Sequence, residues 1–135
     1  MNQERSTIKK MMDRFKLPGN LEVRFVSELV GYGVFATETI KEGSLVEICY
    51  CIEVDDKIKY FIDYSFNNSK PDMALMALGC GSIYNHSEKA NIKWDVCESN
   101  ERLIEFYATR DIAVGEELCH NYGKKYWIKR RKTFI

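Results

Sequence analysis

The sequence predicts a mainly β fold in a single domain, and two observations support this expectation. From Leu21 onward, short runs rich in β-branched and aromatic residues alternate with glycine-containing turns, which is typical of strands joined by hairpins. The chain has 135 residues, which suffice for one compact core but not for two domains of ordinary size. The expected strands are LEVRFV, GYGVFAT, LVEICYCIEV, NIKWDV, RLIEFYATRDI and EELCHNY.

Residues 1–20 differ from this pattern and are expected to form a helical extension. Ser6 is a candidate helix cap, and Pro18 with Gly19 would end the helix. Between them, apolar residues recur at the spacing of one helix face, which could pack on the domain or form a contact in a homodimer. These residues are Ile8, Met11, Met12 and Phe15.

One further helix, short and central, is expected in the segment PDMALMALG, residues 71–79. Asp72 after Pro71 is a candidate helix start, and Gly79 is a candidate stop. Elsewhere, FATETIKEG (35–43) and YATRDIAVG (107–115) share an aromatic residue, Ala, Thr, Ile and Gly at matching positions. This echo predicts two similar strand-and-turn corners rather than a stacked repeat.

The composition is typical of a soluble globular protein. Hydrophobic residues make up 45% of the chain, and twenty basic side chains balance twenty acidic ones. No apolar run reaches the roughly 20 residues of a membrane span, and the polar start MNQERSTIKK lacks the apolar core of a secretory signal. We therefore expect an intracellular, soluble protein. The last twelve residues hold six Lys or Arg and no acid, so this tail could contact DNA or lie in solvent.

The five cysteines contain no C-x-x-C pair, so we expect reduced, mostly buried thiols and no metal site. Cys119 and His120 are neighbours in an expected strand, so their side chains would point to opposite faces and could not form a thiol and base pair. A nucleophilic Cys80 beside His86 is disfavoured, because no carboxylate or amide lies at a suitable spacing to orient the histidine.

Two glycine-containing segments are candidates for ligand binding. Gly31-Tyr32-Gly33 separates two expected strands, where glycine either forms a hairpin or lets the backbone approach a ligand. No helix is expected after it, which excludes the phosphate-binding loops. The second segment is GSIYNHS, residues 81–87, which contains His86. Several tyrosines lie beside glycines or charges, and together they could line a slot for a long aliphatic amine.

Read in chain order, GYGVFAT, GSIYNHS followed by AN, YATRDIAVGEEL and NYG resemble the signature of the SET-domain protein lysine methyltransferases. The similarity to the small viral SET proteins of the chlorella-virus type is greater still and covers about residues 21–130. The resemblance implies a SET (β-clip) fold with a C-terminal pseudoknot at residues 21–123. It also implies that the basic aromatic segment 124–135 closes a cofactor site.

The cofactor implied by this resemblance is S-adenosylmethionine. Its sulfonium is a cation, which aromatic faces and oxygen lone pairs suit better than the anion-binding end of a helix. The GYG turn would lie beside the methionine end of the cofactor, and the Asn-His segment would supply polar contacts. The residues carried over to this site are Gly31, Tyr32, Gly33, Tyr84, Asn85, His86, Tyr122 and Trp127.

By the same resemblance, Tyr122 is the central catalytic residue, with Tyr64 and Tyr126 beside it. The reaction is the transfer of a methyl group from sulfur to a neutral lysine amine, and it needs no metal. Tyr122 would orient the amine, because a phenol with a pKa of about 10 is a poor general base at neutral pH. The lysine channel would be lined by Tyr32, Tyr64, Trp94, His120 and Tyr126.

The resemblance implies a histone tail, with an H3-like tail as the first candidate, as the substrate. It also implies a role in chromatin regulation, in a host nucleus if the protein is viral or an effector. A basic tail would prefer an acidic groove. Candidates for such a groove are Glu47, Glu53, Asp55, Asp56 and Asp63. Two departures from the family pattern leave the degree of methylation open: Ser82-Ile83-Tyr84 before the Asn-His-Ser motif, and His120 where an aromatic residue is usual.

Three alternatives stay open at this stage. The first is a catalytically silent module that binds a peptide or methyl-lysine in the aromatic slot, although the presence of Asn85, His86 and Tyr122 disfavours it. The second is a structural β domain that uses this fold for assembly. The third is a methyltransferase whose substrate is a protein other than a histone.

Overall fold

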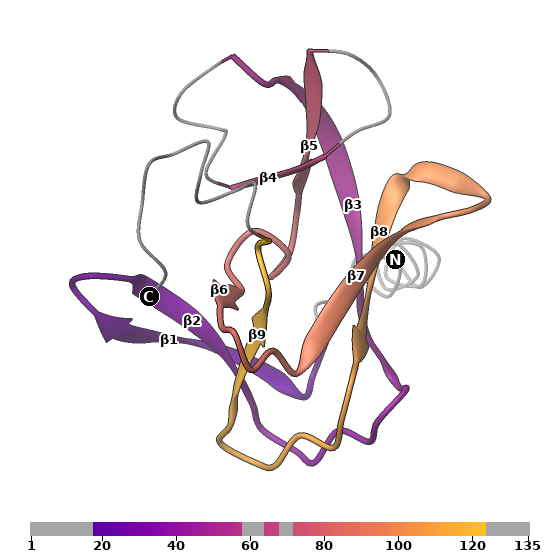
Figure 1. Ribbon diagram of the computed structural model, residues 1–135. Coiled ribbons are helices and arrows are strands. Elements are labelled where there is room, and N and C mark those ends of the chain that lie inside the picture. Colours follow the sequence, from indigo (N-terminus) through magenta and orange to yellow (C-terminus); the bar gives the residue numbers. More distant parts are fainter. Residues whose placement is uncertain (1–17, 58–63, 68–71, 124–135) are drawn as a thin grey trace, which may run out of the picture.

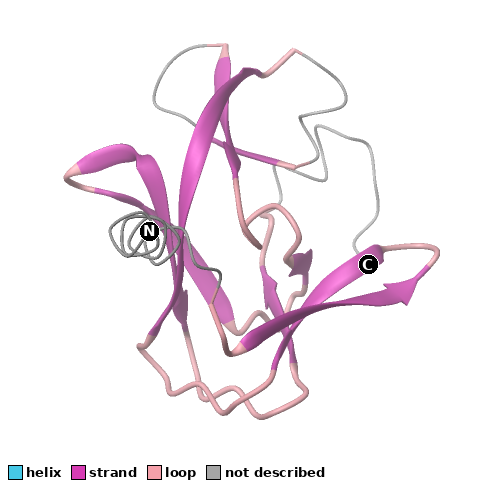
Figure 2. Ribbon diagram, turned by 180° about the vertical axis from the view of Figure 1, so that it is seen from behind, coloured by secondary structure: helices cyan, strands magenta, loops and turns pink. Residues whose placement is uncertain are grey.

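The computed structural model describes residues 18–57, 64–67 and 72–123. The helix expected within residues 1–20 and the C-terminal segment 124–135 lie outside these ranges. The described residues form strands and turns without a helix, as Figure 2 shows, so no helix of these ranges can cross a membrane. The strands are β1 (Leu21–Ser27), β2 (Gly31–Ala36), β3 (Leu45–Asp55), β4 (Ser65–Asn67), β5 (Met73–Ala77), β6 (Asn85–His86), β7 (Ile92–Cys97), β8 (Asn100–Ala108) and β9 (Glu117–His120).

These strands form two sheets, with orders β1-β2-β9-β6 and β4-β5-β3-β8-β7. All pairings are antiparallel except the parallel pair of β6 with β9. Figure 1 shows β6 and β9 in the middle of the molecule, with the β1–β2 hairpin on one side and the β7–β8 hairpin on the other. All six strands expected from the sequence are present, which confirms the mainly β prediction.

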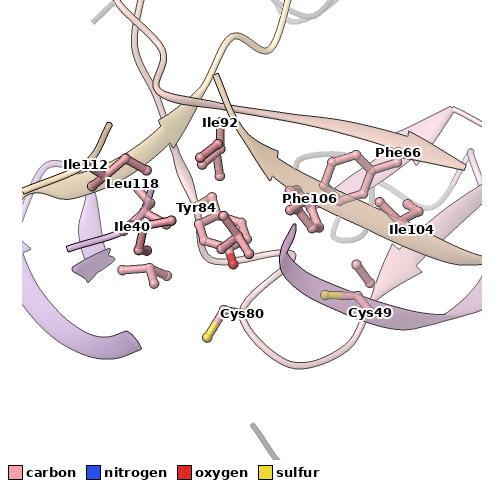
Figure 3. Packing of buried hydrophobic residues seen from close by; sticks show 14 of the residues in the cluster. Ile40, Cys49, Phe66, Cys80, Tyr84, Ile92, Ile104, Phe106, Ile112 and Leu118 are labelled. Carbon is pink, nitrogen blue, oxygen red and sulfur yellow. The ribbon is translucent and has the colours of Figure 1, made fainter. Parts of the chain in front are cut away.

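The hydrophobic core receives side chains from both sheets, and the long strand β3 lines one side of it. Inward residues of β3 such as Cys49 and Cys51 are buried, whereas Ile48, Tyr50 and Ile52 on the other face are exposed, as the alternation of strand side chains requires. Phe106 on β8 is fully buried in the same core (Figure 3). Burial of this apolar surface is the main force that holds the two sheets together.

The expected central helix at residues 71–79 is wrong, because residues Met73–Ala77 form strand β5. This strand pairs with β3 on one side and β4 on the other, with its Leu75 opposite Glu53 and Phe66. Ala, Leu and Met favour helices only by tenths of a kcal/mol per residue, so pairing on both edges outweighs this preference. Asp72 has φ 64°, a left-handed conformation that a helix N-cap does not adopt.

The two echo segments, 35–43 and 107–115, pair with each other, which the sequence did not reveal. Ile40 N donates to Ile112 O at 2.9 Å, and Ile112 N donates to Ile40 O at 2.8 Å. The prediction of two similar corners is confirmed by their matching glycines, Gly43 at φ 81° and Gly115 at φ 84°.

Candidate functional site

The parallel pair β6–β9 brings the Asn-His motif to the C-terminal tyrosine. Asn85 lies opposite Cys119, and His86 lies opposite His120, two residues before Tyr122. The backbone amides of Ser87 and Asn91 donate to carbonyls of His120 and Cys119, respectively. Segment 85–91 therefore runs beside residues Cys119 and His120, near the C-terminal limit of the described chain. The expected pseudoknot requires such a close pairing.

Tyr122 is held at both its backbone and its hydroxyl. Its amide donates to His86 Nδ1 at 3.0 Å, and its hydroxyl donates to the Tyr84 carbonyl at 2.8 Å. Its ring centroid lies 5.2 Å from that of His86. The segment of residues 84–86 thus fixes both the position and the direction of the Tyr122 phenol.

His86 has a structural role that the sequence did not indicate. Its side chain is only 2% exposed, and its Nδ1 accepts the Tyr122 amide proton. A neutral imidazole that accepts at one nitrogen carries its proton on the other, and here Nε2 lies 3.5 Å from Glu88 Oε1. The ring therefore orients the main chain at Tyr122.

Asn85 on β6 links its strand to the start of β2 and to β9. Its Nδ2 donates to the Tyr32 carbonyl at 3.0 Å and to Glu117 Oε2 at 2.8 Å. A Cβ at Gly33 would collide with the Glu117 carboxylate and would lie 3.0 Å from Asn85 Nδ2. A side chain at Gly33 would thus displace the Glu117 carboxylate from Asn85, and Glu117 is a site residue that the sequence analysis missed. The alternation along β9 could have placed it beside β2.

The segment Gly31-Tyr32-Gly33, expected as a turn, instead forms the start of β2, where Tyr32 lies opposite Phe25 on β1. Tyr32 is 59% exposed, and its ring contacts that of Phe25 edge to face at 5.7 Å. Gly31 has φ 78°, with no atom within 4 Å of the position of a Cβ. The backbone conformation therefore accounts for the first glycine, and the packing of Asn85 accounts for the second.

An aromatic cluster joins two of the predicted channel residues through Phe66, which the sequence analysis missed. The Phe66 ring lies 5.0 Å from that of Trp94 and stacks on that of His120 at 5.7 Å. His120 in turn lies 4.8 Å from the Tyr122 ring. The only sequence signal for Phe66 was its position two residues after Tyr64 in the run DYSF.

His120 is a buried, neutral ring next to Tyr122. Its residue is 6% exposed, and its Nδ1 has no hydrogen-bond partner among the described residues. The pKa of His120 is lowered to about 4, mainly by burial; a hydrogen bond at Asn121 opposes this shift, and the nearby His86 adds to it. At neutral pH this position therefore adds an acceptor nitrogen and no charge. Cys119, its neighbour on β9, lies on the opposite face, as expected.

The other aromatic residues predicted for the site are Tyr64, Tyr126 and Trp127. Tyr64 is 58% exposed, and its carbonyl accepts the Ser82 hydroxyl proton at 2.9 Å, which ties the start of β4 to the turn before Tyr84. Tyr126 and Trp127 lie outside the described residues. Of the predicted channel residues that the structure describes, His120 contacts Tyr122, Trp94 reaches His120 through Phe66, and Tyr32 lies on β2.

The prediction of Glu47 as a surface acid is wrong. Glu47 is 5% exposed, and its two carboxylate oxygens accept protons from the Tyr84 hydroxyl at 2.6 Å and the Cys80 amide at 3.0 Å. The pairing of β3 with β8 shifts register between Leu45 and Glu47, so both Val46 and Glu47 face inward. Glu53 is partly buried and pairs with Arg102 at 3.0 Å, whereas Asp63 lies outside the described ranges.

The cysteines are suited to packing rather than to chemistry. All five are free thiols, and Cys49, Cys51 and Cys80 are buried. Burial raises the pKa of Cys51 and of Cys80 to about 11 and that of Cys119 to about 12. Within residues 18–57, 64–67 and 72–123, no three His, Cys, Asp or Glu side chains are grouped closely enough to hold a metal ion.

A mainly β fold in which a parallel strand pair holds an Asn-His segment against a C-terminal tyrosine defines the class that the sequence motifs predicted. The model of the SET domain family matches residues 31–123 of this chain. The chain therefore belongs to the SET-domain family.

The chain is also similar to named relatives of this family. It is 33% identical over 116 residues to a histone-lysine N-methyltransferase, H3 lysine-37 specific, from Schizosaccharomyces pombe, covering 81% of this chain and 77% of that protein. A crystal structure from Plasmodium falciparum, of a protein assigned provisionally to the histone methyltransferases, has a TM-score of 0.66 and 26% identity, covering 80% of this chain and 96% of the other.

A further structure, an inhibitor-bound Polycomb Repressive Complex 2 from Chaetomium thermophilum in humanized mutant form, has the same TM-score of 0.66. Its identity of 24% supports the shared fold alone, and the match covers 83% of this chain but 16% of the other. The fold is thus found as a small part of a larger assembly as well as in a chain of similar size.

Proposed function

We propose that this protein is a lysine N-methyltransferase that uses S-adenosylmethionine and acts on a histone tail, with an H3-like tail as the first candidate. The observation that carries the proposal is the fixing of Tyr122 by the Asn-His segment, through His86 Nδ1 and the Tyr84 carbonyl. The named function of the Schizosaccharomyces pombe relative supports the histone substrate class.

The residues present fit a sulfonium cofactor. S-adenosylmethionine would supply an electrophilic methyl group on a cationic sulfur, which calls for ring faces and oxygen lone pairs rather than cations. The described residues around Tyr122 offer rings and carbonyls, and His120 is neutral. Because the Asn85 amide and His86 Nδ1 already bind protein atoms, cofactor contacts at this segment would come from its backbone, together with Tyr32 and Tyr122.

The reaction also needs an oriented, neutral lysine amine. The Tyr122 hydroxyl donates its proton to the Tyr84 carbonyl, which directs its oxygen lone pairs away from that carbonyl and makes the phenol an acceptor for an amine N–H. The rings of Phe66, Trp94 and His120 exclude water from the adjacent region. Exclusion of water lowers the pKa of an amine, which favours the neutral form.

The test compares methyl transfer by the wild type and Tyr122→Phe. Radiolabelled S-adenosylmethionine and core histones are the substrates, and mass spectrometry locates the modified lysine. Because Tyr122→Phe removes one positioned oxygen, we expect kcat to fall by about 100-fold or more. The matched control is Tyr107→Phe, which removes a hydroxyl bound to Glu105 on β8, outside the site.

Equal activity of both variants would overturn the role of Tyr122. Binding of the cofactor without labelling of any histone would point to another protein substrate, and absence of both would favour the silent binding module. The kinship with small viral SET proteins, and with it a site of action in a host nucleus, stays a prediction that this assay does not address.

A further inference from the structure

We propose that Glu47 is a positioning residue for the Tyr122 hydroxyl, to which it is connected through Tyr84. Neither the sequence motifs nor the comparisons assign it a role. The inference rests on the proposed function for its effect on catalysis, but its structural part concerns the fixed direction of Tyr122 and can be measured without activity.

The Glu47 carboxylate holds both ends of the turn that leads to the Asn-His segment. One oxygen accepts the Cys80 amide proton at 3.0 Å, at the start of the turn, and the other accepts the Tyr84 hydroxyl proton at 2.6 Å, at its end. Within the turn, the amides of Ile83 and Tyr84 donate to the Cys80 carbonyl at 2.9 and 3.3 Å. One buried side chain on β3 thus sets where the turn begins and where it ends.

The turn is also pressed closely against the sheet that carries Glu47. A Cβ at Gly81 would lie 2.5 Å from Ala77 Cβ and 2.9 Å from Cys49 Sγ, so only glycine fits there. The Tyr84 ring is 1% exposed and lies 4.8 Å from that of Phe106; Figure 3 shows it among the buried side chains. A turn fixed in this way transmits the position of Glu47 to the backbone of Tyr84.

The two groups that contact Glu47, the Tyr84 hydroxyl and residue Cys80, hold their protons more tightly than usual. Burial, and then the charge of Glu47, raises the pKa of Tyr84 well above its usual range. Burial and Glu47 likewise raise the pKa of Cys80 to about 11. Tyr84 and Cys80 therefore stay protonated at neutral pH. The Tyr84 hydroxyl is then a permanent donor to Glu47, which makes a strong, directional bond.

Burial of a carboxylate costs desolvation free energy, and well-packed apolar residues of similar size often stabilise a protein as much or more. What an apolar residue could not do is fix a hydroxyl and an amide at defined positions. The carbonyl of the same Tyr84 accepts the Tyr122 hydroxyl proton at 2.8 Å. Glu47 and Tyr122 therefore bind the two ends of one residue, and the position of one constrains the other.

The main variant is Tyr84→Phe, which removes the bond to Glu47 but leaves the ring and the carbonyl. The first measurement is the ¹³C resonance of the Tyr122 ring carbon that bears the oxygen, in protein with labelled tyrosine, assigned by its loss in Tyr122→Phe. We expect this resonance to move in Tyr84→Phe. It should stay in place in the control Ile104→Val, which alters a fully buried core residue on β8.

The second measurement is a double-mutant cycle in kcat at saturating substrates. Tyr84→Phe should lower kcat by about 10-fold or more, with the KM of the peptide within about twofold, because only the direction of Tyr122 changes. In the Tyr122→Phe background the same change should lower kcat less than about twofold, since two steps of one connection are not additive. Ile104→Val should lower kcat equally little in both backgrounds.

Additive effects in the cycle, or an unmoved Tyr122 resonance in Tyr84→Phe, would overturn the proposal. If the wild type transfers no methyl group, the proposed function has failed, and the resonance alone decides the role of Glu47. If Tyr84→Phe does not fold, Glu47→Gln replaces it. A glutamine has an NH2 donor in place of one carboxylate oxygen, so it loses either the bond from the Cys80 amide or the bond from the Tyr84 hydroxyl. The Tyr122 resonance should therefore again move, and its constancy would contradict the proposal.

Discussion

The two corners of the molecule, residues 35–43 and 107–115, have similar backbone conformations, but they lead into different parts of the structure. Gly43 N donates to Ala108 O at 2.8 Å, and Gly115 N donates to Ala36 O at 2.7 Å, so each corner binds the other in the same way. The first corner leads into β3 beside the core. The second leads into β9, which carries the site.

The difference lies in the residue after each turn glycine. Ser44 follows Gly43, and no side-chain hydrogen bond of Ser44 is found among the described residues. Glu116 follows Gly115, and its carboxylate accepts protons from Ala113 N at 3.1 Å, Asn91 Nδ2 at 3.0 Å and Arg110, which lies 2.6 Å away. One side chain thus ties the second corner to Asn91.

Asn91 extends this connection to the site strand. It is 2% exposed, its Nδ2 also donates to the Glu117 carbonyl at 2.8 Å, and its Oδ1 accepts the Cys119 amide proton at 2.8 Å. Among the described residues, the first corner has only exposed side-chain hydrogen bonds, such as that from Glu42 N to Asp111 Oδ1 at 2.8 Å, whereas the turn that leads into the functional strand gains a polar network that reaches the buried Asn91.

The largest expected effect comes from the apolar residues at the centre of the paired corners. Ile40→Ala and Ile112→Ala each remove a buried side chain, so each should lower the free energy of unfolding by about 2–4 kcal/mol. Urea unfolding of both variants checks this. A near-neutral result for one of them would show that the corners do not contribute equally to stability.

Much of the fold could be predicted because its strands carry local signals. The six long β-type runs and the two corners appear at the expected places. The wrong helix at 71–79 and the missed role of Glu47 share one cause, since both depend on pairing with distant segments. β5 is set by β3 and β4, and Glu47 faces inward because of a register shift against β8.

The site was predictable to a similar extent. The motifs identified Asn85, His86 and Tyr122, which the structure brings together. Their mutual contacts could not be predicted, because they depend on the parallel pairing of β6 with β9 across more than thirty residues of sequence. Phe66 and Glu117 were missed for the same reason, since each reaches the site from a different strand.

An intermediate effect is expected when the connection at the second corner is removed. Glu116→Ala should lower the free energy of unfolding by about 1–2 kcal/mol at pH 7, because Ala113 N, Asn91 and Arg110 all lose a partner. Ser44→Ala, the matched change at the first corner, should stay within about 0.5 kcal/mol. A loss of similar size in both variants would remove the difference between the corners.

This effect should also depend on pH. Burial tends to raise the pKa of Glu116, but hydrogen bonds from Ala113 N, Asn91 and Arg110 outweigh it, so the pKa is lowered overall. The Glu116 carboxylate therefore binds a proton more readily in the unfolded chain than in the folded one. Its contribution to stability is complete at a pH above its ordinary pKa of 4.5 and is lost as the pH falls below that value. Unfolding of wild type and Glu116→Ala at pH 7 and pH 4 should show the difference shrinking at the lower pH, and a constant difference would assign the effect to packing.

The smallest expected effect tests what the two corners share. Gly43 and Gly115 both have left-handed φ angles, and no atom lies within 4 Å of a Cβ at either position. Alanine therefore meets no steric obstacle at either glycine, and the cost of Gly43→Ala or Gly115→Ala is the backbone strain alone, about 1 kcal/mol. Because the φ angles are nearly equal, the two losses should agree within about 0.5 kcal/mol. Gly19→Ala, at an open position without a left-handed φ angle, should change little. A clearly larger loss for Gly115→Ala would mean that strain at the second corner is transmitted through Glu116 to β9, and that the two backbones are alike in form but not in mechanical role.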